Sequence, residues 1–293
     1  MDVLVYGSIG YDILTFISEM PLPGKDADVI AEERHLGGEA CNVAVALARW
    51  GIESAIGGNR IANDEGGAFI RQKLAKEGVD ISQIKLCTKA PTPFCRILVA
   101  PGGERFILSY GHKTARFTLP DNTLLRSSRI LVTDRFGGKA RDALTGVAKM
   151  FGAIVISTDV TPDETIRSKN SDVIITSKHF VENTLGETDA AAFLEKMHTI
   201  SRGTIIVTRG ADPVMFSSEN DEISEVDVPR VERVTDTTGA GDTFTAGIAY
   251  GMSKGWEMEE CVRFAAAAAS LSVTRRGADN PPPLEEVLSI TRG

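Results

Sequence analysis

One short stretch of the chain could perform chemistry: Asp236-Thr237-Thr238-Gly239-Ala240-Gly241-Asp242-Thr243-Phe244. A turn of small residues here enters a predicted helix, and such residues let the backbone close on a ligand. Amides at a helix N-terminus attract phosphate oxygens. Asp242 in the first turn adds a carboxylate that could accept a hydroxyl proton, which suits phosphoryl transfer. Asp is also a common helix N-cap, so that alternative stays open from this turn alone.

Two other polar clusters lie where an α/β sheet would bind a ligand. Gly37-Gly38 leads into a predicted helix, and Asn42 in its first turn offers an amide suited to hydroxyl recognition. Asp12 follows the first predicted strand, at the edge where open α/β sheets hold ligands. A carboxylate at this edge can bind two sugar hydroxyls. An ordinary loop and a turn acid are the alternative interpretations.

The composition excludes several classes of protein. The chain has 293 residues, of which 42% are hydrophobic and 25% charged, as expected of an ordinary globular protein. Its net charge of -8 argues against a nucleic-acid partner. The N-terminus resembles no signal peptide, and no apolar run reaches the ~18 residues of a membrane span, so we expect a cytoplasmic protein without a membrane partner. The cysteines have no spacing typical of zinc ligands or disulfides; they are Cys41, Cys87, Cys95 and Cys261.

Short β-branched runs alternate with longer helical patterns, which predicts an α/β fold with a mainly parallel sheet. The predicted strands are 3–6, 54–56, 130–133, 154–157, 173–176 and 205–208. The predicted helices are 41–50, 67–77, 139–150, 189–200, 243–252 and 258–273, the second of them capped by Asn63-Asp64. Helices are expected on both faces of the sheet.

Two segments, about 11–36 and 91–118, interrupt this alternation. The second contains a hairpin-like pair of strands, 94–100 and 105–110, around Pro101-Gly102-Gly103. We expect both segments to leave the main sheet and form a β lid over a ligand, within a single domain spanning residues 1–293. Decorative surface hairpins are the alternative.

Taken together, these motifs resemble those of the ribokinase-like (PfkB) carbohydrate kinases. Residues 236–249, DTTGAGDTFTAGIA, fit the second signature of that family. The first signature is represented by Gly37-Gly38, Asn42, Ala44 and Gly51, but Ala62-Asn63-Asp64 stands where the family usually has Gly-Asp-Asp. The resemblance implies an ATP-dependent kinase with a three-layer α/β/α core, a mainly parallel central sheet and a small β-sheet lid, which forms a homodimer through that lid.

The resemblance also implies roles for individual residues. Asp242 becomes the catalytic base, the backbone of Gly239, Ala240 and Gly241 becomes the anion hole, and Asp12, Gly38 and Asn42 become ligands of the sugar. On the nucleotide side it implies contacts from Thr208 and Gly210, and from Gly239 and Gly241. Lys178 follows the strand 173–176, where many members carry Asn-x-x-Glu; it could meet a phosphate directly, while Mg²⁺ arrives with ATP.

A potassium site is a further implication of the resemblance. Its ligands, mostly backbone carbonyls, would come from Asp236, Thr238, Ser272, Arg275 and Gly277. Arg275-Arg276 would equally serve as a charge pair at a helix C-terminus.

The substrate is the least defined part of this interpretation. Asp134-Arg135 and the segment 157–162 are similar to the ketohexokinase and sulfofructose kinase branch of the family. Arg135 and Lys25, with His112 and Lys113, could gather around an anionic end of the sugar. A neutral ketohexose is slightly favoured over an anionic sugar. A nucleoside kinase of the same family and a non-catalytic sugar or nucleotide sensor are the alternatives.

Overall fold

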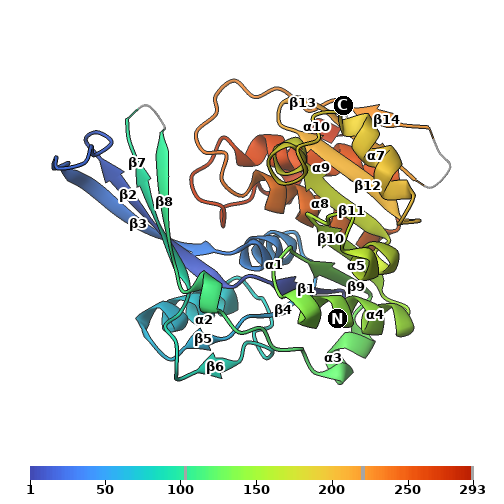
Figure 1. Cartoon of the computed structure of the whole chain (residues 1–293), viewed down its shortest axis with the longest axis horizontal. Coiled ribbons are helices and arrows are strands. Elements are labelled where there is room, and N and C mark those ends of the chain that lie inside the picture. Colours follow the sequence, from blue (N-terminus) through green and yellow to red (C-terminus); the bar gives the residue numbers. More distant parts are fainter. Residues whose placement is uncertain (102–103, 219–221, 292–293) are drawn as a thin grey trace.

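The structure is a computed structural model that describes residues 1–101, 104–218 and 222–291, and an eight-stranded sheet lies at its centre (Figure 1). The neighbouring strands β4, β1, β9, β10, β11 and β12 pair in parallel. Strands β13 and β14 extend the sheet in antiparallel fashion. In spatial order the strands are β14 (Ser224–Val226), β13 (Asp212–Ser217), β12 (Thr204–Arg209), β11 (Val173–Ser177), β10 (Ile154–Thr158), β9 (Ile130–Thr133), β1 (Val3–Gly7) and β4 (Ser54–Gly58). The predicted mainly parallel sheet is thereby confirmed.

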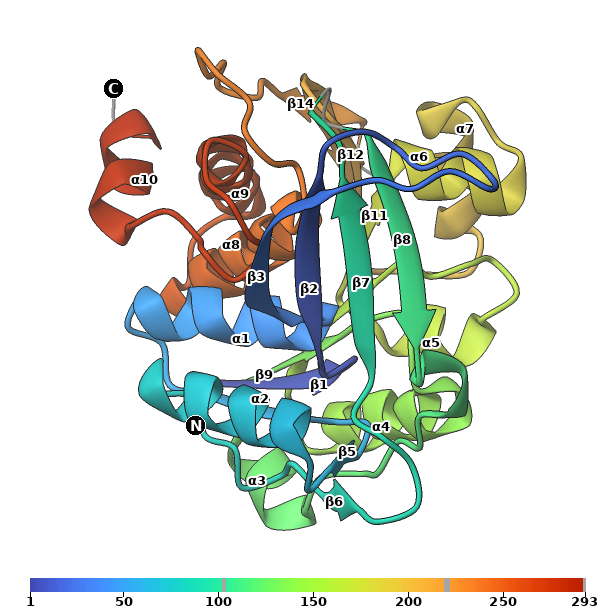
Figure 2. The same cartoon turned by 90° about the vertical axis from the view of Figure 1, so that its left-hand side faces the viewer.

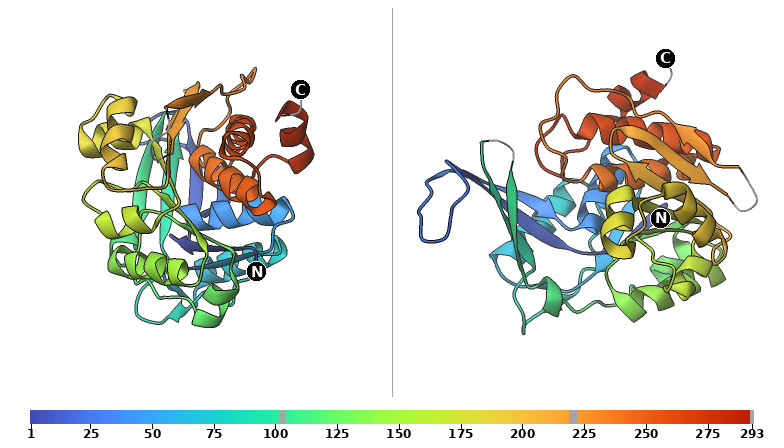
Figure 3. Two further views of the ribbon diagram at one scale, coloured as in Figure 1. Left: turned by 90° about the vertical axis from the view of Figure 1, so that its right-hand side faces the viewer. Right: turned by 45° about the horizontal axis from the view of Figure 1, so that its top comes forward.

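Helices cover both faces of this sheet (Figure 3). Alternation along β1 shows the layering: Val3 and Val5 join the core beneath α1, α8 and α9, whereas Leu4 and Tyr6 join the core beneath α4. The helices are α1 (Glu39–Arg49), α2 (Glu65–Lys76), α3 (Asn122–Ser127), α4 (Gly138–Met150), α5 (Thr165–Asn170), α6 (Lys178–Phe180), α7 (Ala190–His198), α8 (Ala240–Lys254), α9 (Met258–Ser272) and α10 (Leu284–Thr291), with single turns at His112–Thr114 (η1) and Val181–Leu185 (η2). Among the helices described, none is long and apolar enough to span a bilayer.

The helix starts show where local sequence and structure agree. Asp64 caps α2 as expected, since its side chain accepts a hydrogen bond from the amide of Gly67 at 2.8 Å. Helix α8 begins at Ala240 rather than at Thr243, because Gly239 adopts φ 78° and turns the chain directly into the helix. Gly241 and Asp242 therefore lie inside the first helical turn.

A second, four-stranded sheet, which we call the small sheet, projects from the main body (Figure 1), and Figure 2 shows it from its face. Its strands, in spatial order, are β3 (Val29–Gly37), β2 (Gly10–Ile17), β7 (Phe94–Val99) and β8 (Arg105–Tyr110). They lie in the two segments expected to leave the main sheet; of the expected turn, Gly102 and Gly103 lie outside the described residues. Two short strands near its base, β5 (Ile61–Ala62) and β6 (Leu86–Cys87), pair in parallel.

The C-terminal segment ties the small sheet to the main body through Asp279. This carboxylate lies 2.9 Å from His35 Nδ1, accepts the amide of Leu36 at 3.2 Å, and pairs with Lys73 at 2.8 Å. Burial raises the pKa of Asp279, but the hydrogen bonds from His35 and Lys73 outweigh it and lower that pKa to about 2. A short distance further on, the carbonyl of Pro282 accepts the indole N–H of Trp50 at 2.9 Å.

Helices α8 and α9 approach each other closely at Gly247. A Cβ atom on this glycine would lie 2.6 Å from Cα and 2.8 Å from Cβ of Ala265. Since both atoms belong to Ala265, which is buried in α9, neither can move aside without shifting the helix backbone. Gly247 therefore sets the separation of the two helices, and with it the position of the turn that begins α8.

We predict that Gly247→Ala destabilises the protein by ~1–3 kcal/mol, because the added methyl group overpacks the contact between the helices. Gly146→Ala in α4 is the matched control: its Cβ would meet only Asn170 Nδ2 at 3.5 Å, so the gain in helix propensity should raise stability by roughly 0.5–1 kcal/mol. Urea unfolding of both variants measures the difference. Equal stability of the two variants would contradict the packing argument.

Candidate active site

The polar residues singled out in the sequence meet at the carboxyl edge of the main sheet. Strands β1, β9 and β10 are parallel and end together there, so the loops that follow them are neighbours. Helices α1 and α8 pack side by side over the same region, as Figure 1 shows. The first turns of these helices carry Glu39 and Asn42 in α1, and Asp242 in α8.

The turn before α8 is built to expose backbone amides. A Cβ on Gly239 would lie 2.5 Å from Cβ of Ala278, so only glycine fits, whereas the position of Gly241 is open. Asp236 holds the turn by accepting the amides of Thr238 at 2.9 Å and Gly277 at 3.1 Å. The helix thus presents its N-terminus, where a negative charge is stabilised, to open space.

Asp242 is held by Asn42, whose Nδ2 donates to its Oδ2 at 2.7 Å. The pKa of Asp242 is raised to about 7: burial is the largest cause, the charges of Asp134 and Asp159 add to it, and the hydrogen bond from Asn42 opposes it. Asn42 is 6% exposed, and its Oδ1 has no hydrogen-bond partner among the described residues. A buried amide oxygen beside the carboxylate is therefore left without a hydrogen-bond donor from the described part of the chain.

Three more carboxylates, those of Glu39, Asp134 and Asp159, surround Asp242. Glu39, Asp134 and Asp242 line one small hollow between β1, β9 and α8. Burial raises the pKa of Asp134 to about 6, although the amides of Ser8 at 2.5 Å and Phe136 at 2.8 Å stabilise its charge. The pKa of Glu39 is raised well above its usual range by burial and by the neighbouring acids. Within the described ranges, however, no His, Cys, Asp and Glu side chains form a group of three arranged to hold a metal.

Two buried arginines hold the loops that bear these acids. Arg141 in α4 and Arg167 in α5 are 2% and 0% exposed, and both pair with Glu164. Arg167 also donates to the carbonyls of Asp134 at 3.2 Å and Asp159 at 2.9 Å. Sequence analysis did not identify either arginine, since nothing in a helical stretch of mixed charge distinguishes a buried arginine from a surface one.

Asp12, in β2, faces the same site from the small sheet. Its pKa is raised to about 7 by burial and by Asp279 and Asp242, while His35 lowers it. The two glycines before α1 allow this approach: a Cβ on Gly37 would lie 2.5 Å from Asp12 Oδ1, and one on Gly38, at φ 89°, would lie 2.3 Å from the carbonyl of Ser8. The structure therefore brings together Asp12, Gly38, Asn42 and Asp242.

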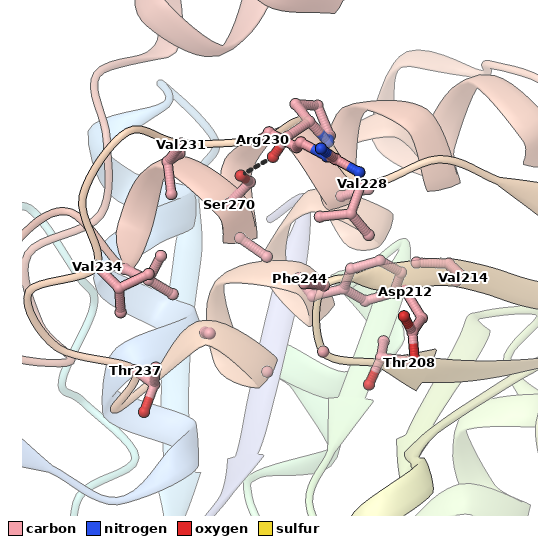
Figure 4. A pocket seen from close by; sticks show the side chains of 18 residues that line it. Thr208, Asp212, Val214, Val228, Arg230, Val231, Val234, Thr237, Phe244 and Ser270 are labelled. Atoms are coloured by element: carbon pink, nitrogen blue, oxygen red, sulfur yellow. Dashed lines mark hydrogen bonds between the residues drawn. The ribbon is translucent and has the colours of Figure 1, made fainter.

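A cavity of about 600 Å³ lies on the other side of the α8 turn (Figure 4). Its walls are mostly apolar, with Val214, Val228 and Phe244 among them. Of the residues predicted to contact the nucleotide, Thr208, Gly210 and Gly241 line it and Gly239 does not; Ala240 lines it too. Lys178 is not among the lining residues and lies 3.8 Å from Glu182, although Ser177 beside it pairs with Thr208 across the sheet.

The residues predicted to hold potassium also lie near this turn. Asp236 and Gly277 are hydrogen-bonded as described above, and the amide of Arg275 donates to the carbonyl of Ser272 at 3.0 Å. The side chain of Arg275 pairs with Glu286 of α10 at 2.7 Å. The cation actually found beside Asp236 is Arg105 of β8, at 2.8 Å, which also donates to the hydroxyl of Thr238. Sequence analysis missed this contact between distant segments.

Of the residues predicted to gather around an anionic end of the sugar, Arg135 and Lys25 are separated. Arg135 lies just beyond β9, with its Nε 3.9 Å from Oε1 of Glu39 and its guanidinium over the ring of Phe136. Lys25 is exposed in the connection between β2 and β3, at the end of the small sheet opposite Asp12 (Figure 1). Several residues of extended strand separate Lys25 from Asp12, so Lys25 does not lie close to Arg135.

The family model described as pfkB family carbohydrate kinase matches residues 1–285. The chain belongs to that family. This kinase is 24% identical over 96% of its length to a nucleoside kinase from Methanothermobacter thermautotrophicus, covering 92% of that protein. It superposes with a TM-score of 0.88 on Arabidopsis thaliana ribokinase complexed with ribose and ATP (24% identity, 100% and 99% of the two chains), and with 0.81 on Xylella fastidiosa fructokinase with bound ATP (25% identity, 99% and 98%).

We predict that Asp242→Asn makes the ligand-free protein more stable at pH 8. The pKa of Asp242 is about 7 in the folded state against a usual 3.8, so the folded state binds more protons and its stability falls as pH rises through this interval. Removing the charge removes that penalty. Thermal unfolding at pH 6 and pH 8 should show a shallower pH dependence in the variant. The exposed Asp227→Asn is the control, and a variant less stable than wild type at pH 8 would refute the argument.

Loss of Arg105 should loosen the small sheet. Arg105→Ala removes a charge-assisted contact to buried Asp236, and we expect roughly tenfold faster hydrogen exchange in β7 and β8 with little change in the main sheet. Arg96→Ala is the matched control, because Arg96 pairs with Glu32 within the small sheet itself. Unchanged exchange in Arg105→Ala would show that the contact does not hold the sheet in place.

Proposed function

We propose that this protein transfers the γ-phosphate of ATP to a hydroxyl of a ketohexose or a related sugar, with Asp242 as the catalytic base. One observation carries the proposal: a carboxylate with a pKa near 7 lies at the amide end of α8, between the cavity of 600 Å³ and the polar cluster around Asp12. A base titrating near neutral pH is suited to accept a hydroxyl proton. A base of this kind also speaks against a non-catalytic sensor.

In this proposal, different residues bind the sugar, accept the proton and stabilise the developing charge. Asp12, Asn42 and the backbone of Gly38 hold the sugar hydroxyls, and Asp242 takes the proton of the attacking hydroxyl. The amides from Gly239 to Gly241 stabilise the charge that develops on the transferred phosphoryl group. Because these donors are fixed by Asp236 and by Gly239, little reorganisation is needed during the reaction.

The cavity beside the turn suits a nucleotide, since its apolar walls can enclose a base and its open end meets the α8 amides. The ribokinase and fructokinase relatives were each solved with ATP, which supports the same donor here. Mg²⁺ would arrive with ATP, whose phosphate oxygens are ligands that it prefers, because the described His, Cys, Asp and Glu side chains form no group of three arranged to hold a metal. When bound, it would neutralise phosphate charge. Potassium would lie beside Asp236, but the guanidinium of Arg105 already pairs with this carboxylate at 2.8 Å and its charge opposes a second cation there.

The substrate class rests on fewer contacts. The relatives' names include ribose, nucleoside and fructose kinases, so family membership does not select among them. Arg135 beside Glu39 can bind an anionic end of a sugar such as sulfofructose. The similarity of Asp134-Arg135 and residues 157–162 to the ketohexokinase branch favours a ketohexose or such an anionic relative. The small sheet would act as a lid over this sugar. Its exposed apolar residues Val29, Ile30, Phe106 and Ile107 suit a homodimer formed through the lid.

Asp242→Asn should reduce turnover by ~10² to 10⁴-fold without loss of fold, because the base is removed while the shape is kept. The measurement is ADP release with Mg²⁺ and K⁺ across fructose, tagatose, sulfofructose, ribose, 2-keto-3-deoxygluconate, sugar phosphates and nucleosides. Asp12→Asn is the companion variant; it should raise the sugar KM more than it lowers kcat. Near-wild-type turnover in Asp242→Asn would overturn the assignment of the base.

A further inference from the structure

A second cavity, of about 520 Å³, lies at the base of the small sheet. It lies between the part of the main body that contains β5 and β6 and the ends of β7 and β8 nearest to that body. Figure 2 shows these segments side by side. It shares no lining residue with the nucleotide cavity or with the carboxylate-lined hollow. Its size falls within the ~300–1,000 Å³ of small-molecule sites.

The charge of this cavity is opposite to that of the chain. Arg60, Lys89 and Arg116 line it, no Asp or Glu does, and the chain as a whole carries a net charge of -8. None of these three side chains forms an ion pair or hydrogen bond with the residues that the structure describes. Many arginines elsewhere are paired, for instance Arg34 with Glu65 at 2.6 Å. Three uncompensated cations around one cavity attract an anion.

A thiol in the cavity wall is influenced by the same positive charges. Cys87 lies in β6, and its Sγ accepts the amide of Lys89 at 3.4 Å. This hydrogen bond is the largest cause that lowers the pKa of Cys87, and the charges of Arg60 and Arg116 lower it further. A negative charge on the sulfur of Cys87 is therefore stabilised by the amide of Lys89 and by the guanidinium groups of Arg60 and Arg116.

The cavity also joins the main body to the small sheet. Pro93 directly precedes β7, and Gly111, at φ 74°, directly follows β8; both line the cavity. The amide of Arg60 donates to the carbonyl of Arg116 at 2.9 Å, which closes the far wall. A ligand held here would touch both feet of the small sheet and the body beneath them.

We propose that this cavity is a binding site for a small phosphate ester. Guanidinium groups pair with phosphate oxygens through two hydrogen bonds at once, and a phosphate monoester carries about -1.5 to -2 charges near neutral pH, which suits three cations. The site is separate from the proposed transfer of phosphate and does not depend on which sugar this kinase uses. Its ligand could be a sugar phosphate, a nucleotide or inorganic phosphate.

The test is protection of Cys87 from iodoacetamide, followed by mass spectrometry of the intact kinase. Cys95, whose thiol pKa is raised by burial, serves as the internal reference. Inorganic phosphate, fructose 1-phosphate and AMP are the three probes. We expect at least one of them, at millimolar concentration, to slow alkylation of Cys87 several-fold, and the strongest probe identifies the source of the phosphate.

Arg60→Gln/Arg116→Gln should abolish this protection, while Lys76→Gln/Lys196→Gln, which changes the net charge equally at exposed helical positions, should retain it. Protection is measured as the ratio of rates with and without probe, so a change in basal reactivity does not affect it. Absence of protection by all three probes in wild type, or equal protection in both double variants, would overturn the proposal.

Discussion

The structure depends on keeping four like-charged carboxylates together at one edge of the main sheet. Glu39, Asp134, Asp159 and Asp242 come from four separate elements and repel one another, yet each is partly or fully buried. Backbone amides and the side chain of Asn42 stabilise individual charges, and Arg167, buried behind the cluster, binds the carbonyls of two of the loops. The arginine thus acts on the backbone and leaves the acid oxygens free.

This arrangement exchanges stability for reactivity. An isolated Asp would be fully ionised and weakly basic at neutral pH, whereas burial among other acids brings the pKa of Asp242 to about 7. The same repulsion makes the ligand-free fold less stable than an uncharged equivalent would be. Cations and hydroxyl donors that enter the site would relieve the strain, so binding of the reactants is linked to stability.

Much of the fold and of the candidate site could be predicted from the sequence. The physical reasons for this also explain which parts could not be predicted. The buried strands such as Ile130–Thr133 form continuous β-branched runs, and the turn before Asp242 is a local signal, so both were recognised. The starts of α1 and α8 were placed late, because the glycine turns before them continue directly into helix. Arg105, Arg167 and Lys25 depend on how distant segments meet, which no local pattern encodes.

The anchoring of the small sheet by Asp279 has a consequence for how the chain is made. Strands β2 and β3 and helix α1 leave the ribosome early, but the carboxylate that fixes His35 follows 244 residues later, and the carbonyl that fixes Trp50 follows 232 residues after that tryptophan. The partner that Asp12 faces across the site, Asp242, is late as well. A nascent chain that ends before Asp242 therefore carries Asp12 and Asn42 without the carboxylate that they face, and the contact with Trp50 forms only after Pro282 has been synthesised.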